Sequence, residues 1–133
     1  MYKRISEAVE FVEKLKPLVE KADHCDVVVG PPFTALKAAA DAAHGSQISV
    51  AAQDLHWDKE GAHTGDVSPA MILDAGCTYV IIGHSERRRD HGETDHQVNQ
   101  KLRPSGEPET EGGARGGIDS HRLRGRNAGG ARS

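Results

Sequence analysis

Apolar residues near the start of the chain recur every three or four positions. The series is Ile5, Ala8, Val9, Val12, Leu15 and Val19. This spacing places them on one face of an α-helix that begins at about Ser6. Because Pro17 lacks the N–H that a helix interior uses, we expect the helix to kink or end near Lys16.

Three short apolar runs follow, at 26–30, 48–53 and 78–82, and the segments between them (34–43 and 68–75) are typical of helices. The run from Tyr79 to Ile82 is continuously β-branched and aromatic, as in a strand buried on both faces. Strands that alternate with helices form right-handed βαβ units and a parallel sheet. The pattern therefore predicts an α/β fold, either a segment of a (β/α) barrel or a doubly wound sheet.

Polar residues gather where each predicted strand ends. No G-x-G-x-x-G or P-loop motif follows any of the strands, which disfavours a nucleotide-binding sheet. In both architectures, functional side chains collect at the carboxyl ends of parallel strands. The candidates at these ends are Pro31 with Pro32, Gln53 with Asp54, and His84 with Glu86.

His84 follows the third run directly after Gly83. Ser85 and Glu86 are typical of a helix start, and the pattern predicts Ser85 as the N-cap. The free N–H groups of a helix start disfavour an imidazolium, so we expect an uncharged His84 that can donate a hydrogen bond to a substrate oxygen. A histidine that only caps or packs is the alternative interpretation.

Composition divides the chain near residue 101. The 133 residues are 36% hydrophobic and 4% aromatic, but beyond residue 101 the large apolar residues are only Leu102, Ile118 and Leu123. We therefore predict a folded domain at 1–101 and a low-complexity Gly/Arg-rich tail at 102–133. The tail is expected to be disordered because it cannot bury a core.

Charge and cysteine usage exclude several classes of protein. A net charge of −3 gives no case for a nucleic-acid or membrane partner, and no apolar run could cross a bilayer. Cys25 and Cys77 are isolated, which indicates reduced thiols in the cytoplasm. The eight histidines show no H-x-x-x-H or Cys/His spacing, so no metal or cofactor site is predicted.

Several segments, in order, resemble the triosephosphate isomerase family. They are I-S-E-A-V-E-F-V (Ile5–Val12), V-V-V-G-P-P-F-T-A-L (Val27–Leu36), A-A-Q-D-L (Ala51–Leu55), G-A-H-T-G-D-V-S-P-A-M-I (Gly61–Ile72), Y-V-I-I-G-H-S-E-R-R-R (Tyr79–Arg89) and G-E-T-D (Gly92–Asp95). The resemblance implies a partial (β/α)8 TIM barrel with strands 2–4 and helices 1–4. It also implies a cytoplasmic homodimeric isomerase of glycolysis and gluconeogenesis. Such an enzyme interconverts the phosphosugars D-glyceraldehyde 3-phosphate and dihydroxyacetone phosphate through an enediol, without a cofactor.

The resemblance also implies roles for individual residues. His84 matches the histidine that polarises the substrate carbonyl, and Glu86 matches the acid beside it, which pairs with the active-site lysine. Thr64 matches a residue that inserts into the neighbouring subunit of the homodimer. Gln53 and Arg88 match polar residues of the interface region, where a structural role is expected.

Two departures from the family bear on activity. The family's catalytic lysine lies in N-W-K-M, and Met1 matches that methionine, so the lysine would directly precede Met1. Lys3 falls two positions further on and is not a substitute. The family's glutamate base and phosphate-binding loops lie on later strands. Because proton abstraction needs a positioned base, we expect negligible isomerase activity from these 133 residues.

The tail has two interpretations. It could be an Arg/Gly-rich RNA-binding segment on a non-catalytic barrel fragment, but it has no aromatic for base stacking and carries several acids. The other interpretation is a frameshift between Lys101 and Glu107. Back-translating Gly117–Ser133 and reading one nucleotide later permits E-S-I-P-I-V-C-V-G-E-T-L-E-E-R-E, which resembles the family's next strand. We prefer the frameshift, which the encoding DNA would test.

Overall fold

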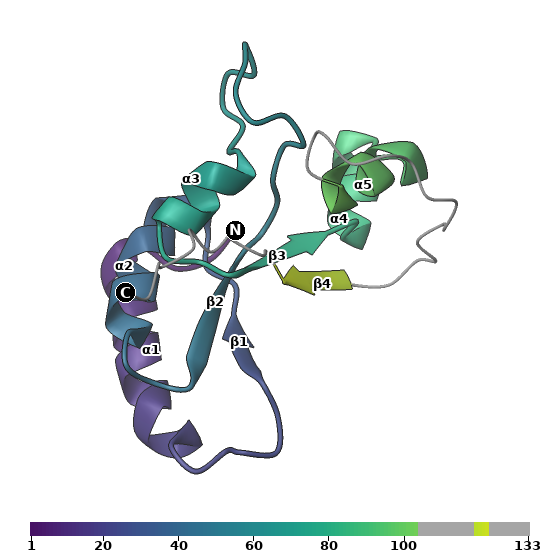
Figure 1. Cartoon of the computed structure of the whole chain (residues 1–133). Coiled ribbons are helices and arrows are strands. Elements are labelled where there is room, and N and C mark those ends of the chain that lie inside the picture. The colour runs from purple at the N-terminus through teal and green to yellow at the C-terminus, as the bar shows by residue number, and fades with distance from the viewer. Residues whose placement is uncertain (104–118, 123–133) are drawn as a thin grey trace, which may run out of the picture.

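The computed structural model describes residues 1–103 and the backbone of 119–122. The helices are α1 (Ile5–Val19), the 3₁₀ turn η1 (Phe33–Ala35), α2 (Leu36–Ala43), α3 (Pro69–Asp74), α4 (Ser85–His91) and α5 (Asp95–Leu102). The strands are β1 (Val27–Val29), β2 (Ile48–Ala52), β3 (Tyr79–Ile82) and β4 (Asp119–Arg122). They form one sheet in the order β1-β2-β3-β4 (Figure 1).

The first three strands are parallel, which confirms the predicted α/β sheet. Val27 pairs with Ile48 across β1 and β2, and Ala51 pairs with Tyr79 across β2 and β3. In Figure 1, α1 and α2 lie together along one side of these strands. Parallel strands in one sheet bring their carboxyl ends to the same edge, which is where the polar strand-end residues were expected.

The core lies between the sheet and the helices. It includes Val12 of α1, Ile72 of α3, Val80 of β3 and Val98 of α5, each at most 2% exposed. The prediction that Tyr79–Ile82 is buried on both faces is only half right, because Val80 and Ile82 are buried whereas Tyr79 and Ile81 are intermediate.

Helix α1, which was expected to kink or end near Lys16, runs through Pro17 to Val19. Pro17 is exposed and lies in the last turn of the helix, so the carbonyl that it leaves without a partner can be hydrated. Continuing the helix also lets Val19 pack against the core. Tertiary packing therefore outweighs the local preference of proline.

Residues 119–122 depart from the predicted disordered tail, because their backbone forms β4. This strand is antiparallel to β3, with Asp119 opposite Ile82 and Arg122 opposite Tyr79. Residues 104–118 and 123–133 lie outside the described residues. The predictions of an RNA-binding tail and of a frameshift fall mainly on those residues and stay predictions.

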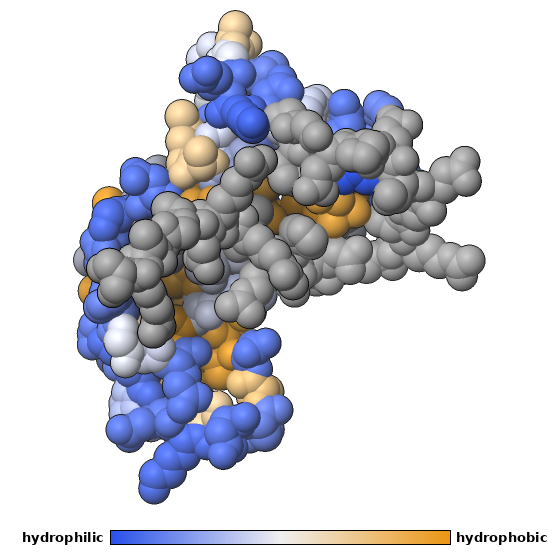
Figure 2. Space-filling view, viewed as in Figure 1, coloured by the Kyte–Doolittle hydropathy of each residue, from blue (hydrophilic) through white to orange (hydrophobic). Residues whose placement is uncertain are grey.

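Apolar surface remains open on the described part of the chain. Val28 of the edge strand β1 is 37% exposed, and Met71 of α3 is 60% exposed. Figure 2 shows orange apolar surface on the concave side of the molecule, between polar ends. No helix within the described ranges is long and apolar enough to cross a membrane.

Candidate active site at the carboxyl ends of the strands

His84 lies just beyond β3 and is itself the N-cap of α4. Its backbone is extended (φ −57°, ψ 141°), and its Nδ1 accepts the N–H of Glu86 at 3.1 Å. The prediction that Ser85 is the cap is therefore wrong, because the imidazole satisfies the free N–H instead. A neutral ring that accepts at Nδ1 carries its proton on Nε2, so Nε2–H is the group that can donate to a ligand.

Glu86 lies beside His84, as the sequence predicted. Its Oε2 is 3.9 Å from His84 Nδ1, and the Glu86 side chain is 69% exposed. Within residues 1–103, no lysine lies within ion-pair distance of Glu86, so the implied lysine partner is not seen there. The carboxylate lies on the Nδ1 side of the ring, away from the donor that would face a substrate.

Gly83 and Arg88 fix the turn that carries His84. Gly83 has φ +68°, and a Cβ there would lie 3.2 Å from Val98 Cγ1 and 3.3 Å from Arg88 Nη2. Arg88 donates from Nε to the Gly83 carbonyl at 2.9 Å and from Nη1 to Asp95 at 2.6 Å. Arg88 therefore joins the end of β3 to the start of α5.

Gln53 and Thr64, the other two residues assigned to an interface, lie apart from this turn in the chain. Gln53 is exposed and donates from Nε2 to the Gly30 carbonyl at 2.8 Å, which joins the ends of β2 and β1. Thr64 is exposed in the long loop between β2 and α3, which extends away from the sheet in Figure 1. Asp66 closes the turn at Thr64 by donating its N–H to the His63 carbonyl at 2.9 Å.

The sequence did not predict a buried ionic cluster beneath the end of β2. Lys101 donates to Asp54 at 2.6 Å and also to Glu93, and the three residues are each at most 9% exposed. Arg87 Nε lies 2.9 Å from the second Asp54 oxygen. These residues line a cavity of about 210 Å³ that does not include His84. One signal in the sequence could have indicated that Lys101 is buried. It follows the apolar residue Val98 by three positions and therefore lies on the same helix face.

Lys3 lies near the end of β1 rather than beside His84. Its Nζ is 5.7 Å from the centre of the Phe11 ring. It lines a cavity of about 130 Å³ with Val29 and Gly30 at the end of β1, and His84 is not part of that cavity.

The fold and the site together define a (β/α)-barrel type of protein, with its candidate chemistry at the carboxyl ends of parallel strands. A family model described as "Triosephosphate isomerase" matches residues 1–109. The chain belongs to the triosephosphate isomerase family.

Individual relatives agree with this family. The chain is 57% identical over 102 residues to a triosephosphate isomerase of Moorella thermoacetica, covering 77% of this chain and 41% of the relative. It is 54% identical over 101 residues to one of Geotalea uraniireducens, covering 76% of this chain and 40% of the relative. The chain thus spans about two fifths of the length of these curated relatives.

A solved structure is similar as well. The crystal structure of triosephosphate isomerase from Bartonella henselae gives a TM-score of 0.72 at 30% sequence identity. The similarity covers 79% of this chain and 44% of that one. The predicted partial TIM barrel is therefore confirmed.

Proposed function

We propose that this chain is the part of a triosephosphate isomerase that polarises the substrate carbonyl. The reaction would interconvert D-glyceraldehyde 3-phosphate and dihydroxyacetone phosphate through an enediol, in the cytoplasm, in glycolysis and gluconeogenesis. The observation that carries this proposal is the capping geometry of His84, in a family whose members are triosephosphate isomerases.

The Glu86 N–H engages His84 Nδ1 and so leaves the other ring nitrogen as the donor. In the proposed reaction, Nε2–H donates to the carbonyl oxygen as negative charge develops there during proton removal. The side chain of His84 is 32% exposed, so a small ligand can reach it.

A second group must remove the proton next to the carbonyl. Within the described residues, the carboxylate within 4 Å of His84 is that of Glu86, and it approaches Nδ1 rather than Nε2. Because a positioned base contributes roughly 10²- to 10⁴-fold in rate, we expect negligible isomerase activity from the chain by itself.

The test combines substrate binding and turnover. Dihydroxyacetone phosphate labelled with carbon-13 at the carbonyl is titrated with the full chain, and we expect the carbonyl resonance to shift as it accepts a hydrogen bond. His84→Ser keeps an oxygen that can cap α4 but removes the imidazole, so the shift should disappear. His96→Ser, at an exposed histidine, is the matched control and should retain it.

Each outcome decides one part of the proposal. No shift with the parent chain, or an equal shift with His84→Ser, would overturn the role of His84. Isomerisation well above the buffer rate would refute the expected lack of a base.

We also propose that the family's homodimer contact uses the Thr64 loop, with Gln53 and Arg88 in structural support. The exposure of Thr64 on an extended loop supports this. Sedimentation velocity should show a concentration-dependent dimer that Thr64→Arg weakens. An unchanged dimer in that variant would contradict the assignment.

A further inference from the structure

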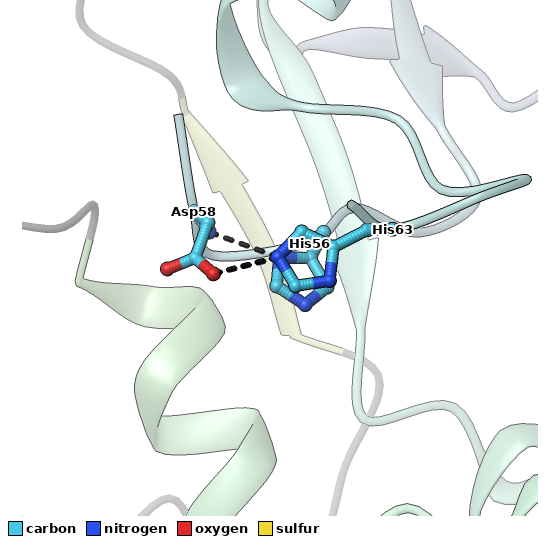
Figure 3. Close-up of side chains that lie close together, drawn as sticks. All are labelled: His56, Asp58 and His63. Atoms are coloured by element: carbon cyan, nitrogen blue, oxygen red, sulfur yellow. Dashed lines mark hydrogen bonds and ion pairs between the residues drawn. The ribbon is translucent and has the colours of Figure 1, made fainter. Parts of the chain in front are cut away.

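Three potential metal ligands meet in the loop between β2 and α3. One ligand atom from each of His56, Asp58 and His63 lies within 4.8 Å of the other two. His63 Nε2 is 2.8 Å from Asp58 Oδ2, and His56 Nδ1 is 3.9 Å from the same oxygen. Figure 3 shows both imidazole rings presenting a nitrogen toward the carboxylate.

These separations are close to those of ligands that share a cation. Two ligands bonded at about 2.0–2.1 Å in a tetrahedron lie about 3.3 Å apart. The two separations from the Asp58 oxygen fall on either side of this value, and a rotation of one imidazole out of the stack would direct the in-plane lone pairs of both rings at one ion. Two imidazole nitrogens with one carboxylate oxygen form a donor set suited to Zn²⁺ and related transition ions.

The loop keeps the three residues close together before any ion binds. The His56 ring stacks on Trp57, at 4.2 Å between ring centres, and on His63, at 3.8 Å. The backbone N–H of His56 donates to the Val67 carbonyl at 2.9 Å, which joins the two sides of the loop. The His56 side chain is accordingly only 13% exposed.

Gly61 makes room for the second imidazole. A Cβ at Gly61 would lie 3.0 Å from His63 Nε2, the atom that faces Asp58. A larger residue would therefore push the ligand nitrogen out of place.

The protonation pattern of His56 also suits a ligand. The backbone N–H of Asp58 donates to His56 Nδ1 at 3.0 Å, so in the neutral ring this nitrogen bears a lone pair and the proton lies on Nε2. Metal binding replaces that hydrogen bond, and the one that His63 Nε2–H donates to Asp58 Oδ2, with coordinate bonds, and the His63 proton moves to Nδ1 through solvent. The Asp58 carboxylate supplies a negative charge to offset the cation.

We propose that His56, Asp58 and His63 form a binding site for a divalent transition-metal ion of the zinc type, with solvent completing the coordination. The site lies on the loop and does not include His84, so it is independent of the proposed isomerase chemistry. The sequence did not predict it, because H-x-D-x-x-x-x-H has neither helical nor Cys/His finger spacing.

The first experiment is calorimetric titration of the full chain with Zn²⁺. We expect one site, with affinity at least about tenfold weaker in His63→Phe and in His56→Gln. His63→Phe is informative because phenylalanine keeps a ring to stack on His56 while removing the ligand nitrogen. His96→Gln removes an exposed histidine outside the cluster and should leave the affinity unchanged.

A second measurement reports the ligands directly. Co²⁺ added to the parent chain should produce visible d–d absorption of low-symmetry nitrogen–oxygen coordination, and His63→Phe should lose it while keeping the parent's far-ultraviolet circular dichroism. The proposal is overturned if the parent binds no Zn²⁺ stoichiometrically, or if His96→Gln weakens binding as much as His63→Phe. It is also overturned if Co²⁺ gives only the spectrum of the hydrated ion.

Discussion

Lys101 Nζ lies 2.6 Å from Asp54 Oδ1, which joins the last turn of α5 to the carboxyl end of β2. The two residues are 47 positions apart in the chain. Glu93 is a second carboxylate partner of the same ammonium group, and all three side chains are buried. This cluster therefore holds α5 against the sheet edge at which His84 lies.

Replacing Lys101 by methionine should strongly destabilise the chain. The substitution leaves Glu93 buried without its cation and Asp54 with Arg87 alone, and breaking a buried pair in this way costs about 3–5 kcal/mol. The free energy of unfolding in urea, followed by circular dichroism, measures the loss. Lys37→Met is the control, because Lys37 pairs with Asp41 on an exposed helix face and should change stability by about 0.5 kcal/mol or less. Equal effects of the two substitutions would contradict the role of the buried cluster.

Gly83→Ala should disturb the turn that carries His84. A Cβ there meets Val98 and Arg88 at 3.2–3.3 Å, and φ +68° is unfavourable for alanine, so we expect a loss of about 1–3 kcal/mol. Gly45→Ala is a matched control, because Gly45 has φ +74° but nothing within 4 Å of its Cβ position. Gly45→Ala therefore measures the cost of the backbone strain alone, without a steric contact at Cβ. Chemical denaturation should therefore show a larger loss for Gly83→Ala, and a smaller or equal loss would refute the packing argument.

Val28→Lys should reduce self-association of the chain. Val28 is 37% exposed on β1, the edge strand of the described sheet, and an exposed apolar edge is a template for pairing with another chain. Leu18→Lys is the control, because Leu18 is 80% exposed at the end of α1 and gains the same charge away from the edge. Light scattering over a concentration series distinguishes them. If both variants scatter alike, added charge rather than the edge controls association.

Cys77 and Cys25 should differ in thiol reactivity. Burial raises the pKa of the Cys77 thiol from 9.0 to about 11, and Cys77 is 0% exposed, whereas Cys25 is exposed. Because the thiolate is the reactive species, we expect one fast thiol at pH 8 and a second only after unfolding. A chromogenic disulfide reagent measures how many thiols react in the fast phase and how many react only after unfolding. Cys25→Ser should abolish the fast phase, and two fast thiols in the parent would contradict the burial of Cys77.

The same raised pKa predicts how stability depends on pH. Between about pH 9 and pH 11, the unfolded chain loses the Cys77 proton while the folded chain keeps it, so unfolding is favoured as pH rises. The contribution is fully present below pH 9. Cys77→Ala should show a smaller loss of unfolding free energy across this range than the parent. A parallel loss in both proteins would show that other groups control the alkaline transition.

Much of the fold follows from local patterns in the sequence. The three- and four-residue spacing of Val12 and its neighbours predicted α1, and the apolar runs predicted all three parallel strands. The block around His84 indicated both the family and the strand-end position of that histidine. These features were predictable because hydrophobic periodicity directly reflects which side of a helix or strand is buried.

Tertiary structure decided the features that depend on where distant or irregular segments meet. In the sequence, Lys101 is an ordinary polar residue of a helix. Only the path of the chain buries it beside Asp54 and Glu93. His84 rather than Ser85 caps α4, because its imidazole accepts the free N–H of Glu86. His56 and His63 have no recognised ligand spacing, and only the folding of their loop stacks one ring on the other. Sequence patterns determine local propensity and burial, whereas the three-dimensional path of the backbone determines which charges and ligands face one another.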